Sequence, residues 1–305
     1  MKHKSKISTI ILIVGCLVGL CLLLYPTVSN YWNNTFATHA IASYREQMTK
    51  PELSEEITAA WDEATAHNRL LAQRDDMFSL SDEQKGAYDR SLNLNGNGMM
   101  GYIEISRIKL TLPIYHGVDA SVLQSAVGHL EWSSLPVGGE STHCVLSGHR
   151  GLLSAKLFSD LDMLREGDVF VLYILNETLT YEVDQIRTVD PNDVGELSIA
   201  AGKDYCTLVT CTPYGVNTHR LLVRGHRVEN AADVSAIISE AVVVDQLMVA
   251  LCLAIPVLVA LLLWVLLKKP APKPTDEPDE TTKEQAQEPP ATFDEKPSAN
   301  KEEHP

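Results

Sequence analysis

The sequence has no excess of basic residues. Its 25 Lys and Arg stand against 40 Asp and Glu, which gives a formal net charge of -15 at pH 7. Because binding to phosphates needs a positively charged surface, this balance excludes a nucleic-acid partner. The glycine-rich patterns that cradle nucleotide phosphates are also absent, so the sequence indicates no nucleotide-dependent chemistry.

Cysteines are few, and their spacing matches no zinc site. Three of the six lie in apolar runs: Cys16, Cys21 and Cys252. Only Cys144, Cys206 and Cys211 remain for the folded part. These numbers exclude a disulfide-rich framework as well as a zinc cluster.

The N-terminus combines a basic flank with an uncharged apolar run. Residues 1–6 carry three lysines, and the apolar run spans residues 7–25. About 20 helical residues cross the hydrocarbon of a membrane, so this length fits a membrane anchor. A signal peptide has the same outline, but no small-x-small cleavage site follows Tyr25. We therefore expect an uncleaved anchor with residues 1–6 in the cytoplasm.

A second apolar run, residues 246–267, contains no charge and is followed by Lys268 and Lys269. Two spans with lysines on both outer flanks predict a two-pass protein of the cell membrane, with both termini cytoplasmic and the middle of the chain outside. The run could instead be a cell-wall sorting signal, but no LPxTG-like motif precedes it and a long tail follows it. That tail, residues 268–305, is acidic and rich in proline, so we expect it to be disordered in the cytoplasm.

Between the two runs the pattern changes from helical to strand-like. In the region 26–97, apolar residues recur at helical spacing on both sides of Pro51, which predicts two amphipathic helices. From 98 to 230, short apolar and β-branched runs alternate with turn residues, and 231–245 is a linker to the second span. We expect strands at 100–105, 109–114, 142–147, 169–175, 179–188, 204–211 and 220–228, with helical inserts at 120–126 and 155–163. Many short strands with few helical inserts predict a mainly β fold, a closed or nearly closed β-barrel.

The stretch Thr207–Arg220 places a cysteine at the end of a strand. Its first half is apolar and β-branched, and Pro213, Tyr214 and Gly215 then break the strand. A second apolar run begins at Arg220, so the loop returns an arginine toward Cys211. A neighbouring cation favours the reactive thiolate form of a cysteine. On this stretch alone, a buried cysteine beside a solvent-facing arginine remains an equal interpretation.

A second predicted strand, residues 142–147, ends two residues before His149, in the sequence Ser147-Gly148-His149-Arg150-Gly151. Neighbouring strands end at one edge of a sheet, so a strand-end histidine and a strand-end cysteine can supply base and nucleophile although they are far apart in the sequence.

Taken together, the segments SGHRG, TLVTCTPYG and HRLLVRG resemble the sortases, and most closely the pilin-polymerising class C sortases. The resemblance covers roughly residues 35–230 and extends to 101–105, 112–117 and 155–158. It implies a sortase-type barrel of about eight strands. It also implies that Cys211 is the nucleophile, His149 its proton-transfer partner and Arg220 the cationic stabiliser.

The resemblance further implies a lid at about residues 74–80. In class C sortases a flexible segment ahead of the barrel carries Asp-Pro-aromatic, whose carboxylate meets the catalytic arginine while the ring covers the cysteine. Asp76 and Phe78 match the ends of this motif, and Met77 replaces the proline. Because proline fixes φ, its loss predicts a lid that opens more readily.

The activity implied is that of a membrane-anchored cysteine transpeptidase. Such an enzyme cleaves an LPxTG-like sorting motif through a thioester and passes the acyl group to a lysine of the next pilin subunit, with no metal or organic cofactor. Its partners would be pilin subunits and the lipid bilayer. Two different functions stay open: a housekeeping sortase that uses a peptidoglycan amine, and a non-enzymatic membrane scaffold.

Other side chains of the same types have simpler interpretations. We expect four further histidines to be structural: His116, His129, His143 and His219. Arg224 and Arg150 are weaker candidates than Arg220 for the cationic role. Cys144 and Cys206 each lie five residues before His149 and Cys211, and we expect buried free thiols rather than a disulfide between them.

Overall fold

The computed structural model describes residues 2–74, 76, 78–230 and 259. It divides into two units, Met1–Leu251 and Cys252–Pro305, and every helix and strand below lies in the first. The predicted linker, second membrane span and tail therefore lie outside the described residues, except for Val259. The two-pass topology stays a prediction.

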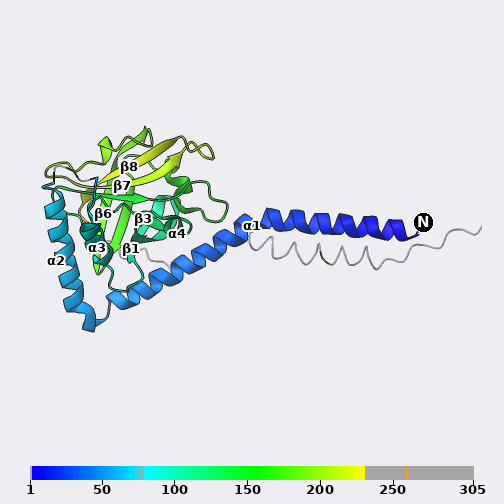
Figure 1. The fold of residues 1–305 in the computed structure, drawn as a ribbon, viewed down its shortest axis with the longest axis horizontal. Coiled ribbons are helices and arrows are strands. Elements are labelled where there is room, and N and C mark those ends of the chain that lie inside the picture. The colour runs from blue at the N-terminus through cyan, green and yellow to red at the C-terminus, as the bar shows by residue number, and fades with distance from the viewer. Residues whose placement is uncertain (1, 75, 77, 231–258, 260–305) are drawn as a thin grey trace, which may run out of the picture. The chain divides into compact units, whose positions relative to one another are not determined.

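Eight strands close into a barrel in the order β1-β2-β3-β4-β7-β8-β6-β5 (Figure 1). The closed, mainly β barrel that the strand pattern predicted is therefore confirmed. The strands are β1 Met99–Ile105, β2 Leu110–His116, β3 Val127–His129, β4 Thr142–Ser147, β5 Val169–Ile174, β6 Glu177–Val189, β7 Asp204–Thr212 and β8 His219–Val228. Neighbours pair antiparallel except β2 with β3 and β4 with β7, which are parallel. Only β3 was not predicted, because three residues that include a glycine carry no periodic signal.

Side chains alternate across the barrel wall, as the period of a strand requires. On β4 and β7 the inner positions include Cys144, Leu146, Cys206 and Leu208, all buried. Inside the barrel Phe170 stacks on Tyr181, with ring centroids 5.5 Å apart. A Cβ atom added to Gly225 would approach the Phe170 ring to 2.7 Å, so the glycine makes room for this pair.

Helix α1 is longer than predicted, because the anchor and the first amphipathic helix form one helix, Lys2–Met48, with Pro26 inside it. Part of it, Val14–Met48, is long and apolar enough to cross a membrane by length and composition. Toward its C-terminal end a helically spaced face is buried: Ala37, Ile41, Tyr44 and Met48. The Tyr44 hydroxyl donates to the Met100 carbonyl and accepts from the Leu175 amide, each at 2.7 Å.

The second predicted helix is α2, Ser54–Leu71, separated from α1 by a short 3-10 turn, η1 Pro51–Leu53 (Figure 1). The side-chain amide of Asn68 on α2 makes two hydrogen bonds with the Leu135 backbone. A third helix, α3 Asp82–Arg90, was not predicted, although its capping box of Ser81 and Gln84 is a recognisable start signal. The remaining elements are η2 Ser106–Ile108, α4 Ala120–Leu123, η3 Leu157–Met163 and η4 Gly195–Leu197.

Candidate active site

Strand β7 lies between β4 and β8, and this order gathers the three candidate residues. β7 and β8 are antiparallel, and Cys211 is the register partner of Arg220. β4 and β7 are parallel, with Ser147 opposite Val209. Because His149 and Cys211 each follow this pair by two residues, both leave the barrel at the same edge.

Two hydrogen bonds to the Gly148 backbone hold the turn that carries His149 beside β7. The Gly148 amide donates to the Val209 carbonyl at 3.0 Å, and the Thr210 hydroxyl donates to the Gly148 carbonyl at 2.7 Å. A Cβ atom at Gly148 would lie 2.7 Å from the Phe158 ring, so only glycine fits this close passage. The buried Thr210 side chain thus positions the turn before His149 from inside the barrel.

Cys211 is on the opposite face of β7 from Thr210 and is half-buried, as are His149 and Arg220. The Arg220 guanidinium donates to the carbonyls of His219 at 3.2 Å and Asn217 at 3.4 Å. Among the described residues, no carboxylate forms an ion pair with Arg220. Its positive charge therefore remains available next to the Cys211 strand position.

An apolar patch covers the outer barrel face next to Cys211. Its buried members are Val145, Leu197, Val209 and Leu222, with Leu130, Trp132 and Val189 packed against them. Val209 precedes Cys211 by two residues, so it lies on the same face of β7. The patch therefore runs along the outer face up to the candidate thiol. Trp132 follows the unpredicted strand β3, which explains why its place here was not predicted either.

One of the two proposed lid residues, Phe78, contacts this patch. The Phe78 ring packs edge-on against Trp132 with centroids 5.0 Å apart, and the Phe78 amide donates to the Asp76 carboxylate at 3.1 Å. Asp76 makes no ion pair with Arg220 among the described residues, so the carboxylate–arginine contact implied by the resemblance does not occur in this conformation. Phe78 also borders a cavity of about 910 Å³ beyond the patch, lined by the end of α2, residues 138–142 and the chain after η4; Cys211, His149 and Arg220 are not among its lining residues.

Replacing Asp76 and Phe78 together by alanine is expected to speed modification of Cys211 by a bulky thiol reagent. An aromatic pair contributes about 0.5–1.5 kcal/mol, so losing it should raise the open population about two- to tenfold. Modification at Cys211 is followed by peptide mass mapping, with Leu70→Ala on the exposed face of α2 as the matched control. An unchanged rate would remove the lid assignment.

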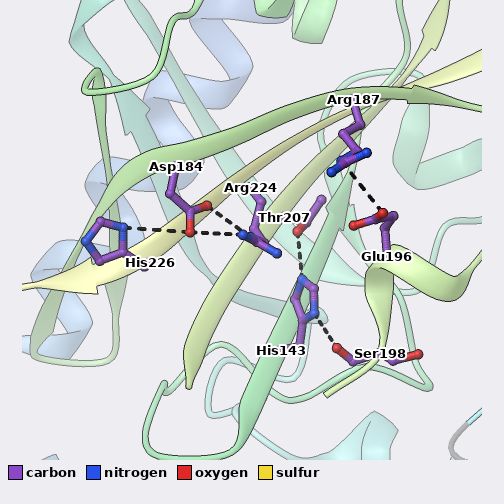
Figure 2. Close-up of polar contacts among 8 residues, drawn as sticks. All are labelled: His143, Asp184, Arg187, Glu196, Ser198, Thr207, Arg224 and His226. Atoms are coloured by element: carbon purple, nitrogen blue, oxygen red, sulfur yellow. Dashed lines mark hydrogen bonds and ion pairs between the residues drawn. The ribbon is translucent and has the colours of Figure 1, made fainter. Parts of the chain in front are cut away.

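A network of polar side chains extends along the same outer face (Figure 2). Its member on β7, Thr207, lies four residues before Cys211. His143 Nδ1 donates to the Ser198 carbonyl at 2.9 Å, and its Nε2 contacts the Thr207 hydroxyl at 2.7 Å. Burial lowers the pKa of His143, so the neutral ring donates at one nitrogen and accepts at the other. Through these two hydrogen bonds, His143 on β4 links Ser198 of the β6–β7 connection to Thr207 on β7.

Arg224 belongs to the same network. It binds Asp184 through two hydrogen bonds of 2.9 and 3.1 Å (Figure 2). Its guanidinium also lies 4.2 Å from the centroid of the Tyr205 ring. Arg187 and Glu196 form a further ion pair at 3.7 Å. With its charge neutralised by Asp184, Arg224 is a poorer cationic stabiliser than Arg220.

Arg150 and three of the further histidines are also held by structural contacts. Arg150 pairs with Asp162 and donates to the Thr212 hydroxyl at 3.2 Å. The ring nitrogens of His116 contact the Gly98 and Ser91 carbonyls, and those of His129 contact Tyr88 and Ser134. His219 is exposed and lies 3.8 Å from Asp190. These contacts favour His149 and Arg220 for the catalytic roles, which remain predictions.

Cys144 and Cys206 are register partners on β4 and β7, both buried and both free thiols. Burial raises the pKa of the Cys206 thiol well above its usual value. Cys206 is therefore an uncharged core group.

Comparison with known proteins agrees with this geometry. The sortase domain family matches residues 103–228. The crystal structure of sortase C1 from Streptococcus agalactiae is 51% identical, covers 63% of this chain and 100% of its own, and superposes with a TM-score of 0.60. The chain belongs to the sortase family. A Clostridium perfringens sortase C structure, described as containing the C-terminal cell wall sorting motif, is 44% identical, with a TM-score of 0.56 and coverage of 64% of this chain and 100% of its own.

Within the family, the chain groups with the class C sortases, as the resemblance predicted. Among curated proteins, Sortase D of Bacillus subtilis is 34% identical over 131 residues, which is 42% of this chain and 63% of that protein. The chain thus matches less than two thirds of the length of this relative. The predicted sortase-type barrel and cysteine transpeptidase class are confirmed.

Proposed function

We propose that this sortase cleaves an LPxTG-like sorting motif through a thioester on Cys211 and transfers the acyl group to a lysine amine of a pilin subunit. The observation that carries the proposal is the strand order β4-β7-β8, which brings His149, Cys211 and Arg220 to one edge of the barrel. The sortase family defines the class of reaction, and the catalytic roles are assigned to residues of this chain.

The chemistry proceeds in two acyl transfers. The Cys211 thiolate attacks the scissile carbonyl carbon, and the peptide C–N bond breaks while the His149 imidazolium protonates the departing amine. The incoming amine then attacks the thioester, His149 accepts its proton, and the thiolate leaves. Because the thioester conserves the energy of the acyl bond, the cycle needs no nucleotide.

Arg220 stabilises the negative charge that develops on the carbonyl oxygen. A guanidinium is permanently charged and offers several donors in a fixed plane, which suits an oxyanion. Two of its contacts are to the backbone of its own loop and hold the head group at the barrel edge. Its position opposite Cys211 supports this role.

The apolar patch suits the leucine and proline of an LPxTG-like motif. Val145, Val209 and Leu222 are apolar and buried in this structure, and packing of the motif's side chains against them would hold it in register with the thiol. Phe78 and Trp132 cover part of this patch, so substrate access requires movement of the lid residues. The C. perfringens sortase C described with a sorting motif supports this substrate class.

The apolar part of α1 indicates membrane anchoring. We further infer a two-pass arrangement with the barrel outside the cell and both termini in the cytoplasm. The lysines that flank the two apolar runs support it.

The test uses the detergent-solubilised full chain with a pilin that carries an LPxTG-like motif. We expect a high-mass covalent ladder that disappears when the acceptor lysine of the pilin is replaced by arginine. A matched reaction offers a peptidoglycan-type amine instead of pilin. Product formed only with that amine would support the housekeeping function, and failure to form any acyl-enzyme would reject the transpeptidase assignment.

A further inference from the structure

Three exposed apolar side chains surround the edge at which the candidate site opens. Leu153 is 68% exposed, Tyr214 60% and Val216 63%. Leu153 lies in the loop that begins at His149, whereas Tyr214 and Val216 lie in the β7–β8 loop between Cys211 and Arg220. We call these three residues the rim. Isolated exposed apolar residues are ordinary, but a group at one functional edge indicates a contact surface.

The two loops of the rim touch each other. A Cβ atom added to Gly151 would lie 3.5 Å from the Tyr214 ring, so the ring packs directly on the loop that follows His149. The Arg150 guanidinium lies 5.8 Å from the centroid of the same ring. The rim is therefore one continuous surface rather than two independent loops.

Helix α1 is hydrogen-bonded to the loop that carries Leu153, which fixes the position of this loop along the helix. The Asn33 side-chain amide donates to the Ser154 carbonyl at 2.8 Å, and the Lys156 amide donates to the Asn30 side chain at 2.9 Å. Leu153 directly precedes Ser154. The rim is thus fixed next to residues 30–33 of α1.

Those residues lie just beyond the apolar run. The run ends at Tyr25, and at about 1.5 Å per residue Asn30 and Asn33 follow about 8 and 12 Å farther along the helix. The headgroup layer extends roughly 5–8 Å beyond the hydrocarbon on each side, and tilting of the helix lowers the height of both asparagines above it. Asn30 therefore lies at the outer boundary of the lipid headgroups and Asn33 just beyond it, so the loop that carries Leu153 meets α1 at the outer boundary of the headgroup layer.

The exposed aromatic residues of α1 mark the same level. Four of them lie within twelve residues of one another and are more than half exposed: Tyr25, Tyr31, Trp32 and Phe36. Aromatic rings of this kind collect at the boundary between membrane and water. Tyr25 and Phe36 lie on either side of Asn30 and Asn33 along the helix. The position of the membrane boundary estimated from helix length therefore agrees with the position that the aromatic residues indicate.

The charges close to the rim are balanced, although the whole chain is strongly acidic. Asp162 pairs with Arg150, and Asp160 pairs with Lys156 at 2.5 Å. The two carboxylates of this loop are therefore neutralised, and they would not repel an anionic bilayer.

From these observations we propose that the rim rests on the headgroup layer of the membrane that anchors α1, so that the candidate catalytic edge opens at the lipid surface. The inference rests on the anchor and the activity proposed above. Its consequence is a preference for sorting motifs held close to a membrane span. The apolar run that ends a sorting signal would provide such a span.

The direct test places tryptophan at the rim. The full chain is reconstituted in phosphatidylcholine–phosphatidylglycerol vesicles that contain lipids brominated near the headgroup end of the acyl chain. Quenching is measured for Leu153→Trp and Val216→Trp relative to the parent chain. Leu70→Trp on α2 is the matched control, because Leu70 is 67% exposed. We expect added quenching at 153 and 216 but not at 70; equal quenching at all three positions would overturn the proposal.

A second test compares two substrates. Leu153→Glu and Val216→Glu should each lower acyl-enzyme formation from a vesicle-embedded pilin precursor about tenfold, because a buried leucine or valine contributes on this scale. Cleavage of a soluble LPxTG peptide should change less than about twofold, and Leu70→Glu should affect neither substrate. Equal losses with both substrates would show that the rim contacts polypeptide instead of lipid.

Two measurements distinguish a failure of this inference from a failure of the anchor or of the activity on which it rests. Vesicle flotation of the parent chain reports the anchor, and cleavage of the soluble peptide by the parent chain reports the activity. If both succeed and the two rim tests fail, only the lipid contact is wrong.

Discussion

Cys211→Ala is expected to abolish acyl-enzyme formation and the pilin ladder, with a loss of about 10⁴-fold or more, because no other group replaces the attacking sulfur. Cys211 is half-buried at the end of β7, so its truncation leaves the barrel core intact. The intact mass of the enzyme after incubation with an LPxTG peptide measures the acyl adduct, and thermal unfolding checks the fold.

The matched control for this variant is Cys206→Ala on the same strand. Cys206 is fully buried inside the barrel, so its truncation should lower the free energy of unfolding by about 1–2 kcal/mol and leave the adduct in place. Adduct formation by Cys211→Ala, or its loss in a folded Cys206→Ala, would contradict the assignment of the nucleophile.

Arg220→Ala is expected to lower kcat by about 10²- to 10³-fold with a much smaller change in KM. Removal of one donor to a developing oxyanion has an effect of this size, because that interaction strengthens only in the transition state. Arg220→Lys should recover part of the loss, since lysine keeps the charge but not the planar arrangement of donors. Steady-state kinetics with a fluorogenic LPxTG peptide give both parameters.

Arg224→Ala provides the control on the same face of β8. Because Arg224 is held by Asp184 and Tyr205, its removal should reduce stability by about 1–3 kcal/mol while kcat changes little. Were the kinetic losses reversed between the two arginines, Arg224 would take the cationic role. Equal losses would indicate that the whole outer-face network, rather than Arg220 alone, supports the reaction.

Local patterns predicted most of the barrel, because its strands are short apolar runs that end at turn residues. The same patterns failed where the signal was weak or ambiguous. Strand β3 is too short to show a period, and α3 is a polar helix marked only by its cap. The anchor at residues 7–25 and the first amphipathic helix were predicted as separate elements, yet α1 joins them with Pro26 inside it. Proline is tolerated in helices that cross membranes.

The candidate site was predictable in part because β4, β7 and β8 each carry a chemically distinctive residue at or just beyond the same edge. Its surroundings were not predictable, since they depend on contacts between distant segments. The Phe78–Trp132 pair joins residues 54 positions apart in the sequence, and the His143–Thr207 bond joins residues 64 positions apart. No periodicity in either segment specifies its partner.

The two faces of β7 impose a constraint on the length of this segment. Thr210 and Cys211 are adjacent in sequence, yet the hydroxyl bonds to Gly148 within the barrel while the thiol lies on the outside. Inserting or deleting one residue between Asp204 and Thr210 would exchange these two faces and bury the sulfur. The two faces therefore fix the number of residues in β7 ahead of the thiol as well as the identity of Thr210 and Cys211.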